Sequence, residues 1–128
     1  CVLDISGYTF NIDAVAPNST LTVKDSTLNG WTSYTSGIEL VTFDNCKFGL
    51  HTYEYLRPYS NTVLTDCEFT SADYQLNAGG SDAYTITLNN CTKNGTAITA
   101  GNVVSLLLDT EDWNSSVTLI VNGVTVTV

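Results

Sequence analysis

The segment VTFDNCKF, residues 41–48, contains the pattern that decides the fold. Apolar and polar residues alternate in it, Asp44-Asn45 follow, and Cys46 is followed by an apolar residue two positions later. Three related segments repeat the pattern: LTVKDSTL (21–28), TVLTDCEF (62–69) and ITLNNCTK (86–93). The marker positions of the repeat are Cys1, Ser26, Cys46, Cys67 and Cys91. Their spacing of 20 to 25 residues is in the range of solenoid repeats.

The first half of each segment reads as a short strand that buries one face. The phase of the apolar residues changes between Phe43 and Cys46, so the polar pair must turn a corner if both ends are to face one interior. Asn and Asp suit such a corner because they tolerate the left-handed backbone conformation and bond to nearby backbone groups. We expect four pairs of residues to face the core: Leu21/Val23, Val41/Phe43, Thr62/Leu64 and Ile86/Leu88.

A third strand is expected after each marker, around residues 52–58 and 73–79. Two pairs take equivalent places in it: Tyr53/Tyr55 and Tyr74/Leu76. Three short strands per repeat, each stacked about 4.8 Å from its equivalent, define a parallel β-helix. A β-sandwich is the alternative, because short alternating strands separated by turns suit both folds. The fixed position of the cysteines favours the solenoid.

The C-terminal part of the chain departs from the repeat. The segment AGNVVSLLLDTEDW (100–113) is the one helical candidate, with Val103, Leu106 and Leu107 on one face. Asn122-Gly123, between two apolar stretches, predicts a β-hairpin. We therefore expect β-helix coils at residues 1–100 and a closing cap at 101–128, which would cover the last strand edges.

The segments VTFDNCKF, TVLTDCEF and ITLNNCTKNG resemble the coils of right-handed parallel β-helix repeat proteins, the pectate-lyase-like fold. The resemblance covers roughly residues 1–100. It implies an all-β fold: a right-handed parallel β-helix, or single-stranded β-solenoid, of about four coils with a short C-terminal helix and a β-hairpin cap. It also implies an extracellular or cell-surface location and a polysaccharide or host-surface glycan as partner. The fold hosts enzymes, adhesins and structural stalks alike, so it does not fix the function.

Composition excludes several kinds of partner. The chain has 128 residues, 43% of them hydrophobic, and a net charge of −9. Such a charge repels phosphate backbones and anionic lipids, so we expect no nucleic-acid partner. No apolar run approaches the roughly 20 residues that span a bilayer, so we expect no membrane span.

The beginning of the chain predicts that it is a piece of a longer repeat protein. Residues 1–10, CVLDISGYTF, lack the basic start and long apolar stretch of a signal peptide. Cys1 already occupies the marker position, so the chain is expected to start in mid-coil and to contact the remaining coils or domains of its parent. A lipoprotein with a lipid-modified Cys1 is the alternative.

The cysteines are expected to form a column of side chains that point inward on successive coils. Metal or redox sites need converging ligands at spacings such as C-x₂-C, and the period here is far longer. Buried free thiols that pack as small hydrophobes are favoured over a disulfide, because side chains along a column point the same way. We predict no metal site and no cofactor.

Four residues are candidates for a glycan-binding surface: Tyr53, Tyr55, Arg57 and Tyr74. If these tyrosines point inward they belong to the core, and if they point outward they would form a platform for sugars. Arg57 is the one arginine, and lyases of this fold, as the resemblance implies, use Ca²⁺ bound by acids and an Arg or Lys as base. An arginine stem that covers exposed tyrosine is the commoner situation, so we assign no catalytic residue.

The other polar residues give no stronger site. Two carboxylate pairs could reach the spacing of a glycosidase: Asp44 with Asp66, and Glu54 with Asp73. The stacking predicts that Lys24 lies beside Asp44, and Lys47 beside Glu68. His51 has no identifiable nucleophilic partner. A column of outward threonines is interrupted by Val63 and is too irregular for an ice-binding face.

These observations predict a non-catalytic, secreted or cell-surface β-solenoid module that acts as a structural spacer or as an adhesive, glycan-facing surface. The alternative is a carbohydrate-active enzyme fragment, either a polysaccharide lyase or a glycoside hydrolase. Enzymatic activity therefore stays an open alternative, and the non-catalytic role is the favoured hypothesis.

Overall fold

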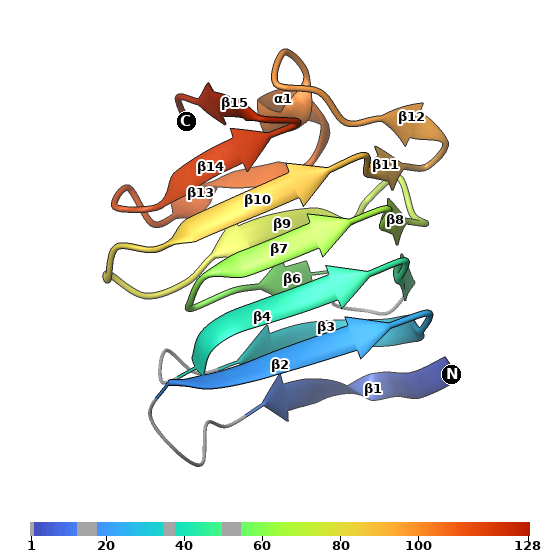
Figure 1. Cartoon of the computed structure of the whole chain (residues 1–128). Helices are drawn as coiled ribbons and strands as arrows, with labels where there is room; N and C mark the ends of the chain where they lie inside the picture. Colours follow the sequence, from blue (N-terminus) through green and yellow to red (C-terminus); the bar gives the residue numbers. More distant parts are fainter. Residues whose placement is uncertain (1, 13–17, 35–37, 50–54) are drawn as a thin grey trace.

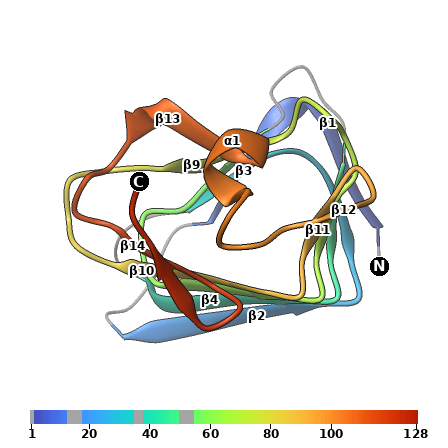
Figure 2. The ribbon, with the colours of Figure 1, turned by 90° about the horizontal axis from the view of Figure 1, so that it is seen from above.

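The computed structural model of the chain describes residues 2–12, 18–34, 38–49 and 55–128. In this part of the chain nearly all regular structure is β-strand, and one short helix, α1 (Val103–Leu106), is present. The strands form two sheets around a common core (Figure 1). Viewed along the stack, the smaller sheet lies on one side of the core and the larger sheet bends around the other sides (Figure 2). The predicted all-β class is confirmed.

The smaller sheet has six strands. In spatial order they are β15 (Val124–Val126), β14 (Thr118–Val121), β10 (Thr85–Asn89), β7 (Thr62–Thr65), β4 (Ile38–Asp44) and β2 (Ser19–Lys24). Neighbours from β2 to β14 pair in parallel, and only the β14 and β15 pair of this sheet is antiparallel. Parallel pairing of this extent does not fit an antiparallel β-sandwich.

The larger sheet has nine strands among the described residues. They are β1 (Val2–Ile12), β3 (Thr27–Tyr34), β5 (Lys47–Gly49), β6 (Tyr55–Arg57), β8 (Glu68–Phe69), β9 (Gln75–Ala78), β11 (Thr92–Lys93), β12 (Thr96–Ala97) and β13 (Leu108–Trp113). β5, β8 and β11 form one row of parallel neighbours, and β6, β9 and β13 form a second. The two rows join at β3, which pairs with both β5 and β6.

The expectation of three separate strands per repeat holds for β4, β5 and β6 and for β7, β8 and β9, and it is wrong for β1 and β3. The long strand β3 supplies both outer strands of its repeat at once. Leu28 of β3 pairs with Phe48, and Thr32 pairs with Leu56. Along the sequence, Phe48 and Leu56 are twice as far apart as Leu28 and Thr32. The shorter path leaves no residues for a loop, so the strand stays continuous.

The register confirms the predicted core positions in the smaller sheet. Val41 lies opposite Thr62, and Phe43 lies opposite Leu64, with Ile86 and Leu88 continuing the two columns. All of these are at most 1% exposed. In the larger sheet Phe48 and Phe69 are also opposite each other, and their rings stack with centroids 5.3 Å apart.

The predicted corners are confirmed in their backbone conformation. Five residues at equivalent corner positions have positive φ angles between 49° and 53°: Asp25, Asn45, Asp66, Asn90 and Asn122. Their backbones join adjacent repeats, since Asn45 N donates to Thr65 O at 2.9 Å and Asp66 N donates to Asn89 O at 3.0 Å. Asn122 was expected only as a hairpin residue, and it serves as a corner as well, because β14 continues the smaller sheet.

The three described cysteines are free and buried, as predicted. Each thiol donates a hydrogen bond to a carbonyl of the preceding repeat. Cys46 Sγ lies 3.4 Å from Val23 O, and Cys67 Sγ lies 3.4 Å from Phe43 O. Cys91 Sγ lies 3.6 Å from Leu64 O. The thiols therefore reinforce the stack without bonding to one another covalently.

The last repeat differs from the expected helix and cap. The helix ends at Leu106, and Leu108–Trp113, which had been expected to be helical, form β13. Leu108 pairs with Leu76, and Leu76 N donates to Leu107 O at 2.9 Å. The open edge of β9 supplies these hydrogen bonds, and this outweighs the helical preference of the leucines. The hairpin at Asn122-Gly123 is confirmed by the pairing of Val121 with Val124.

Residues 101–128, which were expected to form a cap, thus contain α1 and three strands, of which β13 and β14 extend the two sheets. β12 and β15 close the two sheets through antiparallel pairs with β11 and β14. None of the helical structure in the described ranges has the length and apolar character required to cross a bilayer.

Candidate functional site

Of the tyrosines predicted to form a sugar platform, the two that the structure describes do not lie together on a surface. Tyr53 lies outside the described residues, and Tyr55 is partly buried on β6. Tyr74 is fully buried, with its ring centroid 5.1 Å from that of Phe69 and 6.1 Å from that of Phe48. Tyr74 therefore belongs to the core, and its place in a surface platform is corrected.

Arg57, the fourth candidate, is held by two neighbours. Its Nη1 lies 3.3 Å from Asp112 Oδ2, and its Cζ lies 5.5 Å from the centroid of the Tyr59 ring. The arginine side chain is 26% exposed. The expected contact of the arginine with a tyrosine is present, and β13 supplies in addition an acidic partner that the predicted repeats did not include.

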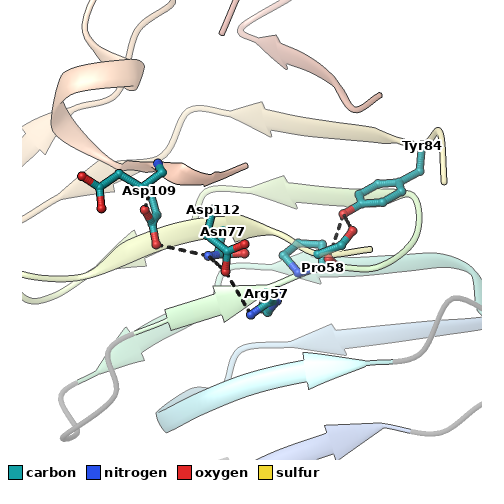
Figure 3. A network of polar contacts seen from close by, with 8 residues as sticks. Arg57, Pro58, Asn77, Tyr84, Asp109 and Asp112 are labelled. Carbon is teal, nitrogen blue, oxygen red and sulfur yellow. Dashed lines mark hydrogen bonds and ion pairs between the residues drawn. The ribbon is translucent and has the colours of Figure 1, made fainter. Parts of the chain in front are cut away.

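An irregularity in β13 brings this acid to the site. Leu108 and Trp113 of β13 pair with Leu76 and Ala78, so four residues of β13 lie opposite the single residue Asn77. This bulge turns two carboxylates toward the amide of Asn77, as Figure 3 shows. Asn77 Nδ2 donates to Asp109 Oδ2 at 3.2 Å and to Asp112 Oδ2 at 3.3 Å.

The network is polar and extends from the buried Asn77 to the exposed Asp112. Asn77 is only 3% exposed, although it lies on the outer face of β9. Leu56 of β6 pairs with Leu76, so the residues that follow them, Arg57 and Asn77, are neighbours across the two strands. Both have a buried polar atom, Arg57 Nε and Asn77 Oδ1, without a hydrogen-bond partner in the described part of the chain. A donor and an acceptor of this kind are matched by a group that both accepts and donates, such as a hydroxyl.

The segment next to the network is fixed by Tyr84. The hydroxyl oxygen of Tyr84 lies 2.8 Å from Pro58 O and 2.7 Å from Gly79 O, so two carbonyls share its proton (Figure 3). Burial raises the pKa of Tyr84, which keeps the hydroxyl protonated. A Cβ at Gly79 would lie 2.5 Å from Cζ of Tyr59, so this position requires glycine for the Tyr59 ring to pack against it.

The arrangement is suited to binding and not to proton abstraction. The Arg57 guanidinium is held by Asp112 and lies over the Tyr59 ring, so it is not free to take a proton from a substrate. Within the described residues no three or more metal-ligating side chains come together. Of the proposed glycosidase pairs, Glu54 lies outside the described residues, and Asp66 Oδ1 accepts a 2.7 Å hydrogen bond from Asn90 Nδ2. His51 also lies outside them.

The lysines have mainly structural contacts. Lys47 Nζ lies 3.8 Å from Glu68 Oε2, as the stacking predicted, and both side chains are largely exposed. Lys24 pairs in register with Asp44, also as predicted. Asn77, Asp109 and Asp112 were not found from the sequence. The acidic run DTED after three leucines (109–112) was the available signal.

Comparison of the chain with protein-family models, with curated proteins and with solved structures gives no significant match. The function is therefore argued from the geometry of the described residues.

Proposed function

We propose that the chain is a secreted or cell-surface module that folds as a right-handed parallel β-helix, or single-stranded β-solenoid. Its role is non-catalytic: a structural spacer whose outer surface can also adhere to glycans. The observation that supports the solenoid best is the parallel pairing of successive strands from β2 through β4, β7 and β10 to β14. Each strand presents the same side-chain positions to the core, so the stack buries one continuous apolar column.

The non-catalytic role is supported by the partners of Arg57. The residue that the sequence suggested as a base is bound to Asp112 and covers Tyr59, which accounts for it structurally. A lyase would need this group free to meet an acidic sugar.

The adhesive version of the role is supported by the network around Arg57. Amide, carboxylate and guanidinium groups next to an aromatic ring are the groups that recognise sugar hydroxyls, and Asp112 and Glu111 on the bulge of β13 are exposed. The glycan would be a polysaccharide or a host-surface glycan that lies along β6, β9 and β13.

Two assays with the whole chain test the proposal. The first measures unsaturated product by ultraviolet absorbance with pectate, alginate and related polyuronates, with and without Ca²⁺. We expect none, and product formation that Arg57→Ala abolishes would contradict the non-catalytic role. The second measures binding to an array of glycans. Saturable binding that Asp112→Ala weakens and Lys47→Ala leaves unchanged supports the adhesive version of the role. If no glycan binds, the structural spacer is the role that stands.

A further inference from the structure

The chain contains three Asn-Gly dipeptides: Asn29-Gly30, Asn94-Gly95 and Asn122-Gly123. Asparagine is chemically labile in this sequence, because glycine has no Cβ to keep its backbone nitrogen away from the asparagine side chain. The nitrogen can attack the side-chain Cγ atom and convert asparagine to aspartate or isoaspartate without an enzyme. The reaction requires the two groups to meet, so the fold decides which dipeptide reacts.

Asn29-Gly30 is restrained by the larger sheet. It lies within β3, and Asn29 is opposite Asp4 of β1 and Gly49 of β5. The backbone at this position is therefore paired on both sides. A change of backbone conformation that brings the Gly30 nitrogen to the Asn29 side chain would first require the neighbouring strands to separate.

Asn122-Gly123 is restrained by the Asn122 side chain. The dipeptide forms the turn between β14 and β15, and both ends of the side-chain amide are bound. Asn122 Oδ1 accepts a hydrogen bond from Asn90 N at 2.9 Å, and Asn122 Nδ2 donates to Ile98 O at 3.2 Å. Rotation of this side chain towards the Gly123 nitrogen would break both hydrogen bonds.

Asn94-Gly95 has the same turn conformation without these restraints. The φ angles are 47° and 80° at Asn94-Gly95 and 49° and 81° at Asn122-Gly123, and both turns are exposed. The Asn94 side chain, however, makes no hydrogen bond to any residue that the structure describes. Its turn joins β11 to β12 through two residue pairs, whereas three pairs join β14 to β15. Local opening is therefore easiest at Asn94.

We propose that Asn94-Gly95 is a site of spontaneous deamidation in the native chain and that the reaction loosens β12. The Gly95 nitrogen bonds to Asn94 Cγ, and the Cγ–Nδ2 bond breaks. The Gly95 N–H proton leaves with the Nδ2 group as ammonia. Water then opens the resulting cyclic imide at either carbonyl and leaves aspartate or isoaspartate. Isoaspartate adds one methylene group to the main chain, which does not suit a two-residue turn between the paired residues Lys93 and Thr96.

Peptide mapping by mass spectrometry tests the site, with the whole folded chain incubated in mildly alkaline buffer. Fragmentation of the peptides assigns the product to one of the three asparagines. We expect deamidation at Asn94 to be at least about tenfold faster than at Asn29 and Asn122. In the urea-unfolded chain the three rates should be similar, because glycine follows each asparagine. Similar rates at Asn94 and Asn122 in the folded chain, or faster deamidation at Asn29 or Asn122, would overturn the site.

Amide hydrogen exchange tests the effect on β12. Ile98 N, directly after β12, donates to Cys91 O at 2.9 Å, so its exchange reports whether the hairpin stays closed. The purified isoaspartate form should exchange this amide faster than the unmodified chain. Asn94→Asp carries the same added charge on an unaltered main chain, so this matched control should exchange at the unmodified rate. Equal exchange in the isoaspartate form and in Asn94→Asp would contradict the loosening of β12.

Discussion

Asn45 and Asp25 occupy the same corner of adjacent repeats, and Asn45 Nδ2 donates a 2.8 Å hydrogen bond to Asp25 Oδ1. The same relationship recurs higher in the stack, where Asn90 Nδ2 donates to Asp66 Oδ1 at 2.7 Å. Both members of each pair have the left-handed conformation. The corners thus turn the chain and also bind one repeat to the next.

Substitutions at Asn45 separate these two contributions. Asn45→Ala removes the hydrogen bond and places at φ 53° a residue that tolerates the left-handed conformation less well than asparagine does, so we expect a loss of about 1–2 kcal/mol in the free energy of unfolding. Asn45→Gly removes the hydrogen bond but suits the backbone, so its loss should be smaller, below about 1 kcal/mol. Urea unfolding measures both, and a glycine variant less stable than the alanine variant would contradict this account.

Truncation of the core column tests the inward phase of the strands. Phe43 is fully buried, and its ring lies edge-on to that of Phe48 with centroids 5.2 Å apart. Phe43→Ala should lower the free energy of unfolding by about 3–5 kcal/mol. Its neighbour Thr42 points outward, so Thr42→Ala is the control and should cost less than about 1 kcal/mol. Similar losses of stability for the two variants would show that the inward-facing and outward-facing positions of the strand are assigned incorrectly.

Because the hydroxyl of Tyr84 is buried, we predict that the protein loses stability at alkaline pH. Its pKa is raised in the folded state, so its contribution is complete below the unfolded value near 10 and is lost as pH rises through the folded value. At neutral pH, Tyr84→Phe should be less stable by about 1–3 kcal/mol because two buried carbonyls lose their donor. The advantage of the wild type should therefore shrink as the pH rises above about 10. Urea unfolding across this range checks it, and an advantage that grows with pH would refute it.

The buried thiols should resist modification in the native state. Burial raises the pKa of the Cys46 thiol, and the neighbouring Cys91 side chain together with burial raises that of Cys67. The neighbouring Cys67 side chain lowers the pKa of Cys91, but Cys91 is only 2% exposed, so a reagent cannot reach it. In the variant Cys1→Ser, which retains these three cysteines, labelling by an aromatic disulfide should require unfolding. Rapid labelling without denaturant would contradict this burial.

The local chemistry of the repeat explains why much of the fold was predictable. Strand alternation and the Asp or Asn corner lie within eight residues of one another, so Ser26, Cys46, Cys67 and Cys91 align the strands correctly. The structure pairs the residues that follow these markers, and Val2 pairs with Thr27 as the alignment of Cys1 requires.

Features that depend on loop length or on distant strands were not predictable in this way. Tyr55 had been aligned with Leu76, but Leu56 takes that position, because the path from Phe48 to Leu56 is one residue longer than that from Phe69 to Leu76. The contact of Arg57 with Asp112 depends on a bulge in a strand that the sequence indicated as helix. No local pattern encodes either one.

The parallel stack of repeats is the central claim, and through-hydrogen-bond couplings in nuclear magnetic resonance test it most directly. These couplings connect a donor nitrogen to the carbonyl carbon of its acceptor. The structure predicts couplings from Asn45 N to Thr65, from Asp66 N to Asn89 and from Asn122 N to Leu88. Their observation together would establish the register at three successive interfaces. Their absence, with couplings that instead join the strands in antiparallel order, would contradict the solenoid and every role proposed from it.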